Sequence, residues 1–183
     1  MVSLLRIGNR RATPRSTLSI PDPDIVVGYN WKSIRGNHKL AFDELPDSLK
    51  FAFPIVVDGH FAFPFSSVEM RIDAKQGPLR NLHLAALMLG GLRYFYQKAY
   101  GKNDGADKFD GKVRVLMATI SRSDVNVFGH WTNSDLGDPN VTHEHFLIKK
   151  WHFEEMEELY VARHGLETLC KWIAPGLREL AKA

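Results

Sequence analysis

The chain has 183 residues, of which 44% are hydrophobic and 25% are charged, and these values fit one globular domain with a sizeable core. The single cysteine excludes an intrachain disulfide and favours a reduced, intracellular setting, with the nucleus as one such compartment. A signal peptide removed before this chain begins is the open alternative. No apolar run approaches the ~20 residues that a membrane span requires, so the sequence predicts no spanning helix.

The charge balance is mildly basic. Lysines and arginines total 24 against 21 acids, a formal charge of +3 that does not by itself indicate a nucleic-acid partner. The first fifteen residues nevertheless contain Arg6, Arg10, Arg11 and Arg15 and no acid. Residues 1–20 are therefore predicted to form a flexible, irregular basic arm. Such an arm suits phosphate contacts, and the alternative is a disordered terminus with no binding role.

Strands dominate the prediction for the first half of the chain. Residues 24–29 are β-branched and aromatic, and residues 53–57 give a second candidate strand. Between them, residues 43–50 favour a helical turn. Residues 63–75 predict a long strand, which Gln76-Gly77-Pro78 breaks.

A helix over residues 78–100 is the clearest predicted element. Apolar residues recur in it at three- and four-residue steps: Leu82, Ala85, Leu89, Leu92, Tyr96 and Ala99. Gly101 is a natural helix stop. Residues 102–111 are rich in Asn, Asp, Gly and Lys and are predicted to form an exposed loop.

The remaining chain predicts a hairpin, a strand and a helix. The hairpin pairs residues 112–120 with 124–132, and residues 141–153 form the strand. Residues 154–172 are predicted to be helical, followed by a short helical piece over 176–182. The order of strands and helices predicts a single α/β domain with a mixed central sheet flanked by helices.

Charged residues alternate along the strand over 63–75. Side chains of a strand point to alternate faces, so Glu69, Arg71, Asp73 and Lys75 share one face. Two interpretations are open for this face. It is either a solvated surface with weak cross-strand ion pairs or part of a site.

Several motifs together resemble the PD-(D/E)XK nuclease-like domains common in fungal proteins. They are the strand Pro23-Asp24-Ile-Val-Val-Gly-Tyr29, the strand Phe63-Pro-Phe-Ser-Ser-Val-Glu69-Met-Arg71, and the Ala/Leu-rich helix that follows. The similar order extends over most of residues 21–175. The resemblance implies a restriction-endonuclease-like core over residues 21–183, in which Asp24 and Glu69 bind Mg²⁺ or Mn²⁺ through carboxylate oxygens.

This sequence departs from the family pattern next to that glutamate. Arg71 stands where the family has a lysine, and arginine keeps the charge but cannot accept a proton. Asp73 and Lys75 are secondary candidates, although Lys75 lies roughly 13 Å along the strand from Glu69. The family's helix before the Pro-Asp strand has no counterpart in residues 1–20, and Asn81 is followed by Leu82 where the family often has an Asn-Gln pair.

These departures favour a nuclease-like domain with weakened or lost catalysis that binds nucleic acid or a protein as a regulator or effector. The alternative is an active Mg²⁺-dependent endonuclease in which Asp24, Glu69 and Arg71 act on DNA. Candidate contacts to nucleic acid are two basic residues of the long helix and two of the last strand: Arg93, Lys98, Lys149 and Lys150.

A second candidate site has weaker support in the sequence. His143 and His145 share one face of a strand and suit a transition metal, with ordinary surface histidines as the favoured alternative. No Gly-rich phosphate-binding loop occurs in the sequence.

Overall fold

The computed structural model describes residues 2–6, 23–30, 44, 61–70, 77–134, 141–152, 160–161, 163–165 and 167–168. The predicted strand over 53–57, the continuation of the long strand over 71–75 and the helical piece over 176–182 lie outside these ranges. Of the turn predicted over 43–50, only Glu44 is described, and it is an exposed turn residue.

Six strands of the described chain form one mixed sheet, and they follow one another in chain order across it. They are β1 (Val2–Arg6), β2 (Ile25–Asn30), β3 (Phe61–Met70), β4 (Val115–Ile120), β5 (Asp124–Asn133) and β6 (Thr142–His152). All neighbouring strands are antiparallel except β3 and β4, which are parallel. The predicted α/β fold with a mixed sheet is confirmed.

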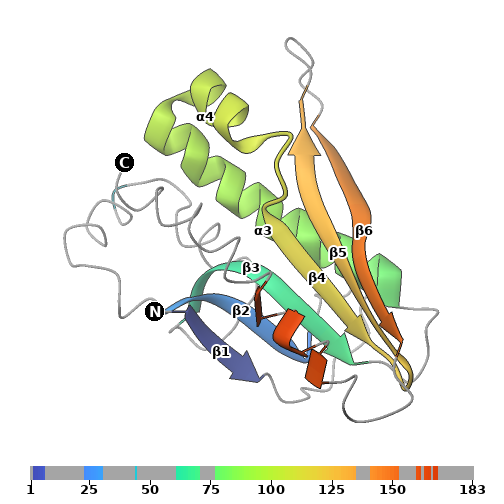
Figure 1. Ribbon diagram of the computed structural model, residues 1–183. Coiled ribbons are helices and arrows are strands. Elements are labelled where there is room, and N and C mark those ends of the chain that lie inside the picture. The colour runs from blue at the N-terminus through green and yellow to red at the C-terminus, as the bar shows by residue number, and fades with distance from the viewer. Residues whose placement is uncertain are drawn as a thin grey trace, which may run out of the picture.

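The parallel step from β3 to β4 is made through two helices, α3 (Gly77–Tyr100) and α4 (Lys102–Phe109). Figure 1 shows α3 crossing one face of the sheet diagonally, with α4 beside its C-terminal end. Parallel strands need such a crossover because the end of the first strand and the start of the second lie at opposite ends of the sheet. Within the described residues, no helix is long and apolar enough to cross a membrane.

The buried stripe of α3 forms one side of the core. Its buried residues recur at three- and four-residue steps, as a helix packed on a sheet requires. They are Asn81, Leu84, Ala85, Met88, Leu89, Leu92, Phe95 and Tyr96. The predicted helix is confirmed, but its stripe is rotated slightly, since Leu82 is half-buried and Ala99 is exposed.

Strand β4 lies at the centre of the fold. Val115, Leu116, Met117 and Ala118 are all fully buried, so both faces of this strand are covered. On one face, β4 residues pack under α3. On the other face, residues 163–165 approach the sheet, because a side chain added at Gly165 would lie 2.5 Å from the Trp151 ring of β6.

Strand β3 accommodates a proline in the middle of the sheet. Pro64 has no N–H to donate, and proline is disfavoured in a central strand. The pairing with β2 is interrupted there: Val27 is opposite Ser66, and the next pair is Tyr29 with Ala62. Phe63 adopts a positive φ of 52° beside the proline. The residues between Ala62 and Ser66, Pro64 among them, are therefore left out of the pairing with β2.

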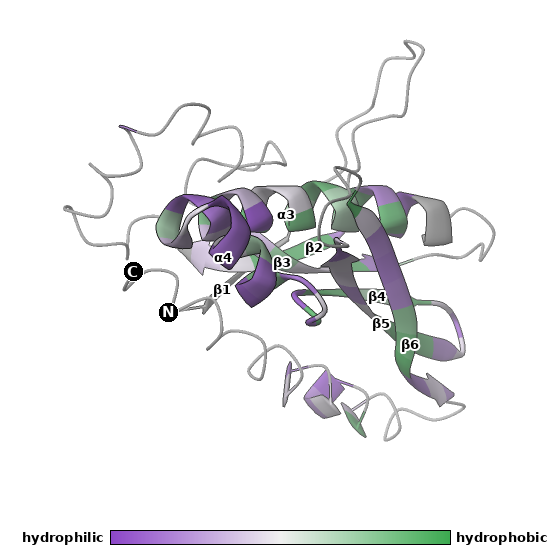
Figure 2. Cartoon of the chain, turned by 90° about the horizontal axis from the view of Figure 1, so that it is seen from above, coloured by the Kyte–Doolittle hydropathy of each residue, from purple (hydrophilic) through white to green (hydrophobic). Residues whose placement is uncertain are grey.

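Two predictions for local structure are wrong. Residues 2–6 were expected in an irregular arm, but Val2–Arg6 pair with β2 as an edge strand. The polar segment after Gly101 was expected to be a loop, but Lys102–Phe109 form α4. Figure 2 shows α4 as mostly hydrophilic, which explains the loop prediction. The helix is held by Phe109, which is fully buried, and by Gly105, which packs against the backbone of α3.

Candidate functional site

The pairing of β2 with β3 brings Asp24 and Glu69 together. Ile25 lies opposite Val68 and Val26 lies opposite Ser67, so Asp24, which directly precedes β2, lies beside the end of β3 next to Glu69. The backbone N–H of Met70 donates to Asp24 Oδ2 at 2.7 Å, which fixes this carboxylate at the end of β3.

The Glu69 side chain lies on the face of the sheet that α3 covers, called the α3 face below. Arg93 of α3 binds Asp110, and Thr132 of β5 donates to the same carboxylate, so Thr132 points toward α3. Asn126 shares this face with Thr132 by strand alternation. The ladders from β5 through β4 to β3 then place Glu69 on the α3 face as well.

Burial separates Glu69 from the solvated surface that is one interpretation of the charged strand. The Glu69 side chain is only 1% exposed, so Glu69 is not part of a solvated face. Ser67, two residues earlier on the same face, is fully buried, and its Oγ lies 2.8 Å from Met117 Sδ of β4. A buried carboxylate is costly to keep in a fold, which makes this end of β3 a candidate site.

A row of polar side chains continues from Glu69 across the sheet. Glu69 is opposite Thr119 of β4, Thr119 is opposite Asn126 of β5, and Asn126 is opposite Lys150 of β6. With Asp24, which directly precedes β2, at its other end, this polar row takes one residue from each of the four consecutive strands β3 to β6, and its members are Asp24, Glu69, Thr119, Asn126 and Lys150. Thr119 and Asn126 are half-buried, and the Lys150 side chain is 54% exposed.

Lys150 is anchored at the open end of the polar row. Its Nζ lies 3.1 Å from Asp124 Oδ1, and the same oxygen lies 3.1 Å from His152 Nδ1. Hydrogen bonds from His152 and Lys150 hold the pKa of Asp124 below its ordinary value. Asp124 therefore stays ionised and keeps the Lys150 ammonium near the face of the sheet.

Lys149 points away from the polar row because of a bulge in β6. Val127 pairs with Lys149 and Phe128 pairs with Leu147, so Ile148 is the extra residue. As a result, Lys149 shares the face of Val127, opposite the α3 face, whereas Lys150 shares the face of Asn126. The two adjacent lysines, both predicted to contact nucleic acid, therefore lie on opposite faces of the sheet.

Arg93 is held inside the protein by an ion pair. Its Nε and Nη2 atoms donate to the two oxygens of Asp110 at 3.0 and 2.9 Å, and the two side chains are 15% and 9% exposed. Thr132 and Ser134 also donate to Asp110. Burial raises the pKa of Asp110, but the hydrogen bonds from Arg93, Ser134 and Thr132 outweigh it and hold the pKa below its usual range. The predicted phosphate contact of Arg93 would compete with this pairing.

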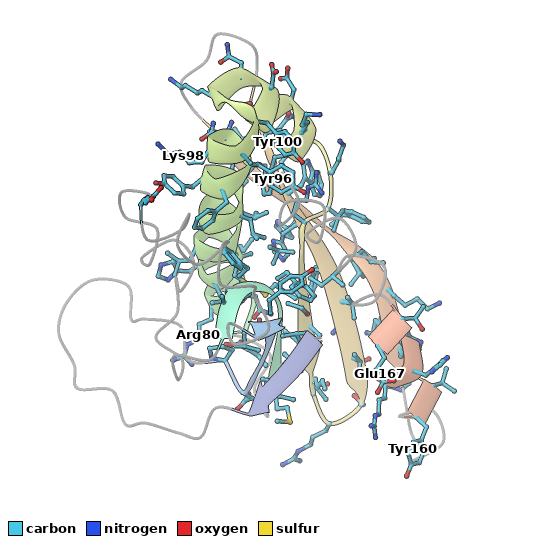
Figure 3. All side chains as sticks on the ribbon, turned by 90° about the vertical axis from the view of Figure 1, so that its left-hand side faces the viewer. Arg80, Tyr96, Lys98, Tyr100, Tyr160 and Glu167 are labelled. Carbon is cyan, nitrogen blue, oxygen red and sulfur yellow. The ribbon has the colours of Figure 1, made fainter. Side chains whose placement is uncertain are left out.

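Lys98 lies far from the carboxylate pair. It is exposed, and its ammonium lies 5.4 Å from the centre of the Tyr94 ring. Figure 3 places Lys98 near one end of α3 and Arg80 near the other. The remaining predicted site residues, Arg71, Asp73 and Lys75, lie outside the described residues, so their roles stay predictions.

The histidines of β6 gather with a histidine of β5 on the α3 face. His145 is opposite His130, and their rings stack with centroids 5.4 Å apart. Burial, with a further contribution from His145 and His143, lowers the pKa of His130 to about 4. Among the described residues, no three His, Cys, Asp or Glu side chains are placed to hold a metal ion. His143 and His145 are both exposed.

Comparison with known proteins identifies a family for this chain. A family model described as a domain of unknown function, DUF7924, matches residues 7–181. The chain belongs to the DUF7924 family. The matched region of this DUF7924 chain includes the whole polar row, from Asp24 to Lys150. No curated protein and no solved structure matches the chain.

The polar atoms of the row suit two kinds of ligand. The neighbouring carboxylates of Asp24 and Glu69 offer the oxygen ligands that Mg²⁺ and Mn²⁺ prefer. The hydroxyl of Thr119, the amide of Asn126 and the ammonium of Lys150 are donors that suit phosphate oxygens. Sequence reasoning missed Thr119 and Asn126 because they become neighbours of Glu69 only through the strand register.

Proposed function

We propose that this DUF7924 chain is a nuclease-like domain that binds nucleic acid and whose catalysis is weakened or lost. The observation that carries the proposal is that Asp24, whose carboxylate binds the backbone of Met70, lies beside the buried Glu69 at one end of a polar row that reaches Lys150. Two neighbouring carboxylates offer the oxygen ligands that a divalent cation prefers.

The chain topology supports the resemblance to PD-(D/E)XK nucleases. The antiparallel pair β2–β3, the crossover helix α3 and the parallel strand β4 follow in the order that the resemblance implies. Asp24 directly precedes β2 and binds the backbone of Met70, so it lies close to Glu69, as two ligands of one cation must. Their oxygens fit Mg²⁺ or Mn²⁺.

The chemistry that such a bound cation supplies is polarisation of a phosphodiester and a lower pKa for an attacking water. The chain's own residues give weaker support to catalysis. Arg71, two residues after Glu69, carries positive charge toward a phosphate but does not accept a proton from water. Glu69 is 1% exposed, and one Asp24 oxygen already accepts a hydrogen bond from Met70. These features favour binding over hydrolysis.

An active endonuclease is the second candidate, and the same carboxylate pair favours it. In that case Asp24 and Glu69 would bind the cation, and Arg71 would stabilise charge that develops on the phosphate. Acidic residues on the two strands would then be required for cleavage but not for binding of nucleic acid in the absence of divalent cations.

Binding is tested with fluorescently labelled DNA and RNA, measured by anisotropy from about 50 to about 200 mM NaCl. Binding that weakens with salt is the expected result, because phosphate contacts release counterions. Absence of binding to both polymers at the lowest salt would refute the proposal and leave a protein-binding domain.

Catalysis is tested on plasmid DNA and on RNA with Mg²⁺ or Mn²⁺. The wild-type chain is compared with Glu69→Gln, which keeps the side-chain shape, and with Arg71→Lys, which restores the family's residue. We expect little or no cleavage by the wild-type chain. Cleavage that Glu69→Gln abolishes would instead establish the endonuclease.

A further inference from the structure

We infer that the open part of the polar row, formed by Thr119, Asn126 and Lys150, is a track along which one nucleic-acid strand crosses the sheet. This inference rests on the proposed function and adds to it the path of the ligand and the residue at its far end. The ligand class is a polymer with several phosphodiesters, as opposed to a mononucleotide or an isolated phosphate.

The length of the row sets the size of the ligand. Thr119 and Lys150 are separated by two steps between neighbouring strands, from β4 to β6. Strands lie ~4.8 Å apart, so the two residues are ~10 Å apart across the sheet. One strand of B-form nucleic acid advances ~3.4 Å per nucleotide, and ~10 Å therefore spans about three nucleotides. A single phosphate cannot contact both ends.

Thr119 and Asn126 carry hydrogen-bond donors that are partly accessible to solvent. Thr119 and Asn126 are half-buried, in contrast to the fully buried Ser67 and Met117 one position deeper on the same face. Hydroxyl and amide donors commonly contact phosphate and sugar oxygens and position a nucleic acid without reading its sequence. The change from buried to half-buried marks where the covered part of the α3 face ends.

Lys150 supplies the positive charge at the open end. Its ammonium lies 3.1 Å from Asp124, on the α3 face, and its side chain is more than half exposed. A phosphate that binds here competes with Asp124 for the ammonium, and the Asp124 charge repels it. Asp124 therefore limits the affinity at this end of the track.

An alternative explanation of the row is purely structural. In that view Lys150 and Asp124 form a surface ion pair, and Thr119 and Asn126 fill a cross-strand ladder, each with a small effect on stability. The alternative predicts that Lys150 and Lys149 contribute alike to binding of nucleic acid, as two exposed charges of one strand.

The bulge in β6 provides a matched pair of variants. Lys150→Ala removes a charge from the α3 face, and Lys149→Ala removes a charge from the opposite face one residue away. Binding to fluorescent single strands of about 16 nucleotides is measured as a function of salt. Lys150→Ala should weaken binding about tenfold at about 50 mM salt and reduce the slope of log affinity against log salt by about one. Lys149→Ala should change neither quantity.

A third variant tests the role of Asp124. Asp124→Asn removes the repulsion and the competition for Lys150, so its affinity should rise above that of the wild-type chain. Equal effects of the two lysine variants, or a larger effect of Lys149→Ala, would overturn the track while the binding function stands. Failure of the wild-type chain to bind any nucleic acid would refute the proposed function, and the track with it. Melting temperatures of the variants show whether each has folded.

Discussion

His130 should make the stability of the protein depend on pH. The side chain is 3% exposed in the core beside α3, and its Nε2 atom has no hydrogen-bond partner among the described residues. Burial, aided by His145 and His143, lowers its pKa from 6.5 to about 4. Below pH 6.5 the unfolded chain binds a proton at this position, whereas the folded chain does not until the pH approaches 4. The contribution of neutral His130 to the free energy of unfolding is therefore fully present above pH 6.5 and is lost as the pH falls toward 4.

The magnitude follows from the two pKa values. The full difference of about 2.5 pKa units corresponds to about 3 kcal/mol, reached only below pH 4. Between pH 7.5 and pH 5.0 the loss is about 2 kcal/mol, because folded His130 is still mostly neutral there. For a chain of this size, that loss lowers the melting temperature by about 4–8 °C. His143, whose pKa is also lowered by burial, adds a loss in the same direction.

The assay is urea unfolding at pH values from 7.5 to 4.5, with His130→Leu as the comparison. The compared interval, from pH 7.5 to 5.0, lies above the ordinary carboxylate pKa values of about 3.9–4.3, so Asp110 and Asp124, with their lowered pKa values, contribute little to the change. Leucine has no proton to bind, so the variant should lose about 2 kcal/mol less than the wild-type chain between pH 7.5 and 5.0. Parallel pH profiles for the two proteins would refute the assignment of a buried, neutral His130.

Three further predictions concern the packing of α3 and α4. Asp110→Asn should destabilise the fold by about 3 kcal/mol, because the Arg93 guanidinium then stays in a largely buried position without its counter-charge; chemical denaturation measures the loss, and a value below 1 kcal/mol would argue against the ion pair. Gly105→Ala should cost about 2–3 kcal/mol of unfolding free energy, since the new Cβ meets the α3 backbone at 2.5 Å. Gly90→Ala, with open space around it, should instead stabilise α3 by about 0.5–1 kcal/mol. The opposite order of melting temperatures would contradict the close contact between Gly105 and α3. Leu89→Ala should cost about 2–5 kcal/mol of unfolding free energy through the cavity that it leaves, and a near-neutral effect would show that Leu89 is not in the core.

The regular elements of this fold could be predicted from the sequence because their patterns are strong. The apolar period of α3 and the alternation in β5 gave their positions to within a few residues. The helix α4 could not be predicted in this way. Its composition is that of a loop, and it is stabilised by contacts that depend on the fold, namely the burial of Phe109 and the close approach of Gly105 to α3. Strand β1 likewise depends on its pairing with β2.

The candidate site was only partly predictable for a related reason. Asp24 and Glu69 each belong to a recognisable strand motif, so both could be named as candidates from the sequence. Thr119 and Asn126 have no motif of their own, and only the register of β3, β4 and β5 places them beside Glu69. Alternation along β6 would give Lys150 the opposite face from His143, but the bulge at Ile148 reverses the alternation and returns Lys150 to the α3 face.

The double burial of β4 has a consequence for how the site moves. A strand that is paired on both edges and covered on both faces opens only when much of the domain unfolds, so its amides should be among the slowest to exchange with deuterium. Thr119, at the end of this strand, is the middle residue of the polar row. The centre of the row is therefore carried by a well-protected strand, and a ligand that binds there meets a backbone that is already ordered.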